Sequence, residues 1–186
     1  MKKLSLFLVL IIVICSFAAC GKNSENAEME APDGTAGVTN DAVHFNVFYP
    51  KEWECDRNDG MITVSPMGST ETKASVSVRE SSALESAVSP EDYWEDSKAE
   101  LESLGYKCSF GTGKAVTLGG VDAWRVEYGI AVGETTYKVT QIFAYKNIDS
   151  TNRMFTVTCV GNEKDYQDEN ITKGFNTVID NLSFKD

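Results

Sequence analysis

Three stretches of the chain differ in how their apolar residues are spaced. Residues 4–17 are almost continuously apolar, a run shorter than the roughly 20 residues that a membrane-spanning helix needs. Residues 21–41 are mostly polar or small, so they bury too little surface to fold and are expected to form a flexible linker. From Val43 onward apolar residues recur with the periods of strands and helices. We therefore expect one folded domain at residues 43–186.

Alternation of apolar and polar residues predicts most of a sheet. Val43, Phe45 and Val47 are each separated by one polar residue, which is typical of a strand with one buried face. Other runs of this kind lie at residues 61–65, 74–79, 121–132, 136–146 and 153–160. Residues 56–60 and 66–72 are rich in the residue types that form turns. The last three runs predict a long antiparallel meander.

Two helices are predicted, one before the meander and one after it. Ser89 is a suitable N-cap, and Pro90 followed by two acidic residues fits the first helical turn. Gly105 fits the C-terminal end of this helix. An apolar stripe at helical spacing predicts the second helix over residues 164–182. An antiparallel sheet flanked by helices is an α+β fold.

The N-terminal region has the features of a targeting signal. Two lysines precede the apolar run at residues 4–17, and two alanines follow it, which is the pattern of a secretory signal peptide. Residues 17–20, Phe-Ala-Ala-Cys, resemble the lipobox of bacterial lipoproteins. This resemblance implies that residues 1–19 are removed and that Cys20 becomes the N-terminus, with a diacylglyceryl group on its sulfur. Residues 20–42 would then be a lipidated cysteine and its linker; an uncleaved anchor helix is the alternative.

The resemblance to lipoproteins also gives a location. Two acyl chains anchor a protein stably, whereas one does so only marginally. We therefore expect the domain at the cell membrane, on its outer, extracytoplasmic face, with the covalent lipid on Cys20 as its contact with the membrane. The formal charge is −11, and it becomes −13 when the two leader lysines are removed. This acidity argues against nucleic acid as a partner, because nucleic-acid binding depends on neutralising phosphates.

The residues needed for familiar catalysis are scarce. The chain has a single histidine, His44, which counts against histidine-based catalytic triads and against metal sites with a histidine pair. His44 lies at a polar position of its strand, so we expect it to face solvent and to be inert. Cys55, Cys108 and Cys159 form no Cys-x-x-Cys motif and fit apolar positions. We expect three buried or half-buried thiols, with one disulfide as the alternative, and we expect no metal, cofactor or catalytic residue.

A second resemblance covers most of the domain. The segments at residues 45–53 (FNVFYPKEW), 119–128 (GGVDAWRVEY) and 175–184 (FNTVIDNLSF), together with a helix in mid-chain, are similar to PsbP-like proteins, including bacterial lipoproteins of the DcrB-like kind. The resemblance implies an α/β/α sandwich with an antiparallel sheet. It also implies a non-enzymatic binding or accessory role, but it assigns no ligand residue to this chain.

Three functional hypotheses remain open at this point. The first is a surface lipoprotein with a non-catalytic binding or accessory domain. The second is a carrier of a lipid or small hydrophobic ligand, because the chain has more aromatic residues than caps and turns need. The residues concerned are Trp53, Trp94, Trp124, Tyr128, Tyr137, Phe143 and Tyr145. The third is an extracytoplasmic hydrolase that uses Asp or Glu, suggested by the 28 acidic residues.

Overall fold

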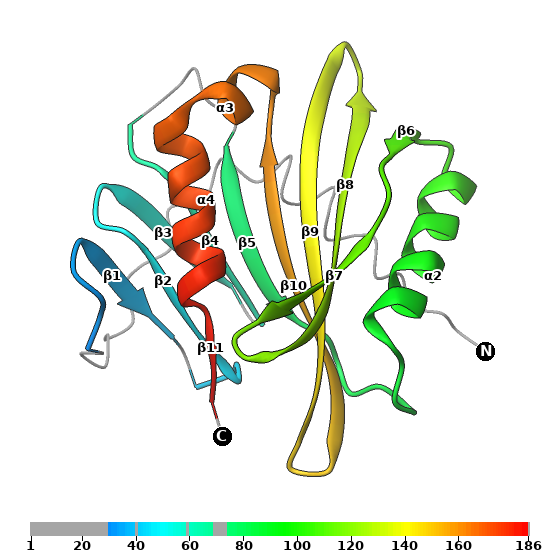
Figure 1. Cartoon of the computed structure of the whole chain (residues 1–186), viewed down its shortest axis with the longest axis horizontal. Coiled ribbons are helices and arrows are strands. Elements are labelled where there is room, and N and C mark those ends of the chain that lie inside the picture. The colour runs from blue at the N-terminus through cyan, green and yellow to red at the C-terminus, as the bar shows by residue number, and fades with distance from the viewer. Residues whose placement is uncertain (1–29, 40, 59, 69–73, 186) are drawn as a thin grey trace.

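The computed structural model describes residues 30–39, 41–58, 60–68 and 74–185 (Figure 1). Its strands are β1 (Thr35–Val38), β2 (Phe45–Pro50), β3 (Trp53–Asn58), β4 (Met61–Pro66), β5 (Ser75–Glu80), β6 (Lys107–Phe110), β7 (Lys114–Leu118), β8 (Val121–Val132), β9 (Thr135–Ile148), β10 (Thr151–Gly161) and β11 (Ser183–Phe184). Its helices are α2 (Pro90–Ser103), α3 (Glu163–Gln167) and α4 (Glu169–Asn181). The α+β class predicted from the sequence is confirmed.

Two antiparallel sheets organise the strands. The main sheet has the order β3-β4-β5-β10-β9-β8-β6, and β7 also pairs with β8. The small sheet has the order β1-β2-β11, so it brings together residues near the two ends of the described chain. The meander predicted over residues 121–160 is the centre of the main sheet, where β8, β9 and β10 are its longest strands.

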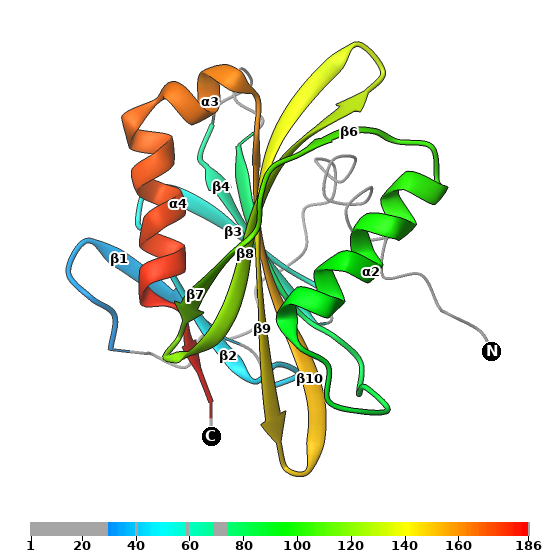
Figure 2. The same ribbon diagram turned by 45° about the vertical axis from the view of Figure 1, so that its right-hand side comes forward.

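Helices lie on both faces of the main sheet (Figures 1 and 2). Helix α2 contacts β6, β8 and β9 on one face, whereas α4 and the small sheet lie on the other. Strand β9 has apolar side chains on both faces of the sheet. Val139 and Phe143 belong to the apolar cluster on the α2 side, and Ile142 and Ala144 belong to the cluster on the α4 side. Side chains alternate along a strand, so the sheet is a central layer between two cores.

Helix α2 begins as the sequence predicts. Ser89 is its N-cap, and the Ser89 hydroxyl oxygen accepts a hydrogen bond from the backbone N–H of Asp92 at 3.0 Å. Pro90 occupies the first helical position, where its missing N–H costs nothing. Gly105 follows the helix with φ of +78°, a conformation that glycine adopts without strain.

The predicted second helix is in fact two. Asp168 adopts an extended backbone conformation that ends α3, and its side chain accepts hydrogen bonds from the backbone N–H groups of Asn170 and Ile171 at the start of α4. This cap satisfies donors that a new helix leaves free. Periodicity alone did not show the break, because the apolar stripe belongs almost entirely to α4.

Two expectations near the N-terminus need correction. Strand β1 lies inside the stretch predicted as linker; it pairs with β2, with Ala36 opposite Tyr49. Backbone pairing does not require large side chains, so folded structure begins before Val43. The turn predicted at residues 56–60 is shorter than expected, because β3 continues to Asn58 and pairs it with Met61.

Candidate functional site

Cys20 and the rest of residues 1–29 lie outside the described ranges, so the predicted lipidation site stays a prediction. Among the helices that the structure does describe, none combines the length and apolar character needed to cross a membrane. The search for a site therefore concerns the folded domain.

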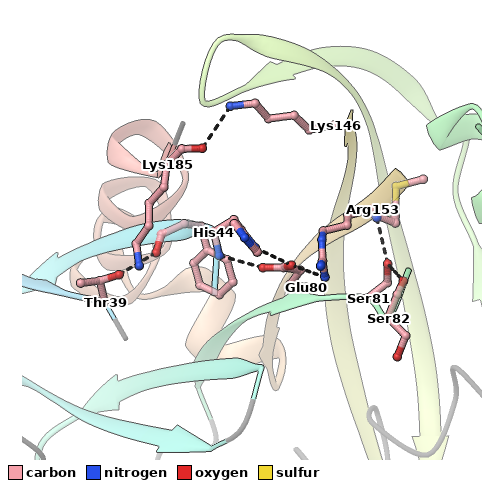
Figure 3. A network of polar contacts seen from close by, with 10 residues as sticks. Thr39, His44, Glu80, Ser81, Ser82, Lys146, Arg153 and Lys185 are labelled. Carbon is pink, nitrogen blue, oxygen red and sulfur yellow. Dashed lines mark hydrogen bonds and ion pairs between the residues drawn. The ribbon is translucent and has the colours of Figure 1, made fainter. Parts of the chain in front are cut away.

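The most concentrated group of polar contacts surrounds Glu80, at the end of β5 (Figure 3). Only 3% of its side chain is exposed. Its Oε1 atom lies 2.8 Å from Nδ1 of His44 and 2.6 Å from Nη1 of Arg153. Its Oε2 atom accepts a hydrogen bond from the backbone N–H of His44 at 2.8 Å. A buried carboxylate is costly unless it is paired and hydrogen-bonded, and these three contacts meet that need.

The Glu80 network, defined here as Glu80, His44 and Arg153, joins elements that are distant in sequence. Glu80 lies on the same face of β5 as Val76 and Val78, which is the side covered by the small sheet. His44 comes immediately before β2, and Arg153 lies on β10. The network therefore ties the small sheet to two adjacent strands of the main sheet.

The structure corrects the expectation for His44. Its side chain is 32% exposed and points with Nδ1 toward a carboxylate rather than freely into water. A carboxylate accepts hydrogen bonds, so with Glu80 ionised the ring hydrogen at this contact lies on Nδ1. The sequence did carry a signal for this network: Glu80 continues the alternation of Val76 and Val78, which places a carboxylate at a core position.

Further contacts extend this region to the C-terminal segment. The backbone N–H of Lys185 donates to the carbonyl of His44 at 2.9 Å, and Nζ of Lys146 donates to the carbonyl of Lys185 at 3.3 Å (Figure 3). On the other side, the Ser81 hydroxyl oxygen accepts from the backbone N–H of Met154 at 2.9 Å. Polar contacts thus hold the chain on both sides of Glu80.

A histidine oriented by a carboxylate can serve as a base in catalysis. Such a role also needs a nucleophile within hydrogen-bonding distance. In the described ranges, no hydroxyl or thiol group forms a hydrogen bond with the His44 ring. The geometry instead supports a structural role for the Glu80 network. The same part of the chain contains no group of three or more His, Cys, Asp or Glu side chains that could hold a metal ion.

The three domain cysteines are free thiols, with Cys159 buried and Cys55 and Cys108 half-buried. Burial raises the pKa of Cys55 to about 11 and that of Cys159 to about 12. Because the thiolate is the reactive form, both groups are poor nucleophiles near neutral pH. The preference for unpaired thiols over a disulfide agrees with the structure.

The predicted aromatic residues are divided between the two cores. Trp94 packs against Tyr128 and Phe143, with ring centroids 5.5 and 6.0 Å apart, on the α2 side of the main sheet. Trp53 packs against Phe175 on the other side, at 6.2 Å. Trp53, Trp94, Tyr128 and Phe143 are buried, so these four are core residues rather than the lining of one shared groove. Trp124, Tyr137 and Tyr145 are half-buried.

Comparison with known proteins identifies the fold. No protein-family model and no curated protein sequence matches the chain. Among solved structures, the chain is similar to LpqN of Mycobacterium tuberculosis (TM-score 0.59, 15% identity, 83% of this chain and 87% of that chain covered). It is also similar to cyanobacterial PsbP from Synechocystis (0.59, 13%, 91% and 99%) and to the Ran-binding protein Mog1p of Saccharomyces cerevisiae (0.54, 8%, 82% and 96%). The fold is therefore PsbP-like, as the sequence resemblance implied.

Proposed function

We propose that this protein is a lipoprotein of the outer face of the cell membrane, in which a PsbP-like domain acts as a non-catalytic binding or accessory module. The observation that carries the proposal is the order of features along the chain. A signal-like segment ends at a lipobox cysteine, Cys20, and residues 21–34 then lead to β1, the first strand of the small sheet. As a flexible coil, a linker of this length reaches roughly 20 Å, enough to hold the domain close to the lipid headgroups.

The binding role is supported by the polar chemistry of the domain. The residues with the clearest acid–base potential, His44 and Glu80, pair with each other, and Glu80 also pairs with Arg153. Two structural neighbours point the same way: LpqN is described as involved in cell envelope biogenesis, and Mog1p as Ran-binding. The aromatic side chains that favoured a hydrophobic carrier are largely used in packing, which places that hypothesis second. The hydrolase hypothesis has no observation in its favour beyond the abundance of carboxylates.

Metabolic labelling with palmitate tests the anchor. The wild-type protein should incorporate label and remain in the membrane fraction, and Cys20→Ala should lose both properties. Cys108→Ala is the matched control, because Cys108 is a half-buried thiol of the folded domain and its loss should leave labelling unchanged. Label that persists in Cys20→Ala would refute the lipid anchor.

A second measurement addresses the side of the membrane. Protease added to intact cells, or to spheroplasts where an outer membrane is present, should degrade the domain while a cytoplasmic marker survives. Protection of the domain until the membrane is dissolved would contradict the proposed location.

A further inference from the structure

One half of the α2-facing side of the main sheet is lined by polar residues. Helix α2 contacts β6, β8 and β9, whereas β4, β5 and β10 extend the same face beyond it. The residues concerned, which we call the hydroxyl face, are Thr63, Ser77, Arg79, Thr156, Thr158 and Gln141.

The strand register places these residues in two adjacent rows. Directly opposite residues run from Thr63 to Ser77, then to Thr158 and Gln141, on four neighbouring strands. In the next row Arg79 lies opposite Thr156. Opposite residues of an antiparallel pair lie on the same face, with Cβ atoms about 5 Å apart. Hydroxyl, amide and guanidinium groups therefore share one continuous area.

This area differs from an ordinary solvated sheet face in how its polar groups are buried. Ser77 is 4% exposed and Thr158 is 6% exposed. Thr158 receives a hydrogen bond from Gln141 Nε2 at 3.1 Å. The Ser77 hydroxyl, in contrast, donates no hydrogen bond to a side chain of this row within the described ranges. Ser77 Oγ is not among the fully buried polar atoms that lack a partner in the described part of the chain, so it keeps access to solvent, and a ligand with polar atoms can replace the water there.

Arg79 provides an independent observation. Its side chain is half-buried, and its guanidinium forms no ion pair or hydrogen bond within the described ranges. This is notable in a chain with 28 acidic and 17 basic residues, where Arg125 and Arg153 both have carboxylate partners. A guanidinium presents a planar set of donors that matches a carboxylate or phosphate group.

Aromatic rings border the hydroxyl face on its α2 side. Phe143 lies opposite Thr156 in the strand register, and Tyr93 of α2 packs on Phe143 with centroids 5.7 Å apart. The positive charge of Arg79 acts on Tyr93, where it opposes the rise in pKa that burial causes. At the opposite end of the longer row, Asp56 pairs with Thr63. The Asp56 carboxylate would repel a negatively charged group of a ligand at that end. The ligand therefore places its negative charge near Arg79.

We infer that the hydroxyl face binds an anionic carbohydrate, with a carboxylate or phosphate group on Arg79 and sugar hydroxyls on Ser77, Thr156 and Thr158. Hydroxyl side chains both donate and accept hydrogen bonds, as sugar hydroxyls do. This inference rests on the proposed binding function of the domain but not on the lipid anchor.

Nuclear magnetic resonance of the arginine Nε–Hε groups tests the site in the protein as it is purified from cells, in detergent micelles when it is membrane-bound. D-glucuronate and glucose 6-phosphate are the probes, and glucose is the neutral control. Both anionic sugars should shift the Arg79 signal in a saturable way, and glucose should require at least tenfold higher concentration. Arg79→Gln should weaken binding of both probes at least tenfold, and Ser77→Ala should weaken it several-fold. Arg125→Gln, which alters a cation paired with Glu127, should bind like the wild type.

Each contrary result has a distinct meaning. The absence of a saturable Arg79 shift with either probe would overturn the inference, and the anchor would still be judged by palmitate labelling. Binding that persists unchanged in Arg79→Gln would place the ligand elsewhere and leave the binding function intact. Inorganic phosphate binding as tightly as glucose 6-phosphate would refute recognition of the sugar. If circular dichroism shows that Arg79→Gln is unfolded, Ser77→Ala carries the test, because it removes only the hydroxyl group.

Discussion

The indole ring of Trp53 packs directly on the backbone of Gly174, so closely that a β-carbon at Gly174 would overlap the Cζ2 atom of Trp53. This contact joins β3 to α4 and explains a glycine in the middle of a helix. Glycine at this position destabilises the helix by up to about 1 kcal/mol relative to alanine. The close approach of a large buried aromatic ring offsets that loss.

We predict that Gly174→Ala destabilises the protein although alanine is the better helix former. Trp53 must shift away from α4, and overpacking of this kind costs about 1–3 kcal/mol. Urea unfolding followed by tryptophan fluorescence measures the change. Asn176→Ala, at an exposed position of the same helix, is the control and should be neutral or slightly stabilising. A Gly174→Ala variant as stable as the control would contradict the packing described here.

Replacing Glu80 with glutamine should be strongly destabilising. The change leaves the shape but removes the charge that partners Arg153 and His44, and breaking a buried ion pair in this way costs about 3–5 kcal/mol. Glu127→Gln is the matched control, since Glu127 pairs with Arg125 while 60% exposed, and exposed pairs contribute about 1 kcal/mol or less. Equal effects of the two substitutions in chemical unfolding would show that the Glu80 network does not stabilise the domain.

The stability of the domain should fall at alkaline pH. Burial raises the pKa of Cys159 from 9.0 to about 12, so the folded state retains a proton that the unfolded state releases. This contribution is fully present below pH 9 and is lost as the pH rises toward 12. Cys159→Ala should show a smaller loss of stability between these values than the wild type, as measured by urea unfolding at several pH values. Parallel losses in the two proteins would assign the effect to other groups, such as the buried tyrosines.

The boundary of the folded domain can be tested by deletion. Removing residues 21–31 should leave the melting temperature unchanged, because this stretch precedes Pro32, whose carbonyl accepts hydrogen bonds from Thr35 of β1. Extending the deletion through Val38 should lower it, because β2 then loses a pairing partner and the buried side chain of Val38 is absent. Thermal unfolding monitored by circular dichroism distinguishes the two variants. An unchanged melting temperature after the longer deletion would show that the stable domain begins at Val43, as the sequence predicts.

Local sequence patterns predicted most of the fold. Alternation revealed the long strands β8, β9 and β10, and the cap at Ser89 located α2, because both signals depend on neighbouring residues. Strand β1 was missed because it is made of small residues and is held by backbone pairing with β2. The break at Asp168 was missed because an apolar stripe does not record a cap within it.

The polar sites were harder to predict because they depend on register. Nothing local indicates that Glu80 meets His44, which is 36 residues away along the chain. The row from Thr63 to Gln141 likewise exists only once four strands are aligned. The alternation of Val76, Val78 and Glu80 indicates that Glu80 faces the core. The partners of Glu80, however, are known only from the three-dimensional structure. Lipidation of Cys20 remains a prediction.

The small sheet has a mechanical consequence for a tethered protein. Strand β1 is the first strand of the described chain, and the small sheet covers the face of the main sheet opposite to the hydroxyl face. A force on residue 35 would act first on β1 and β2, whose connections to the main sheet include the Glu80 network and α4. In the proposed tethered protein, the small sheet and the main sheet therefore lie between the tether and the hydroxyl face.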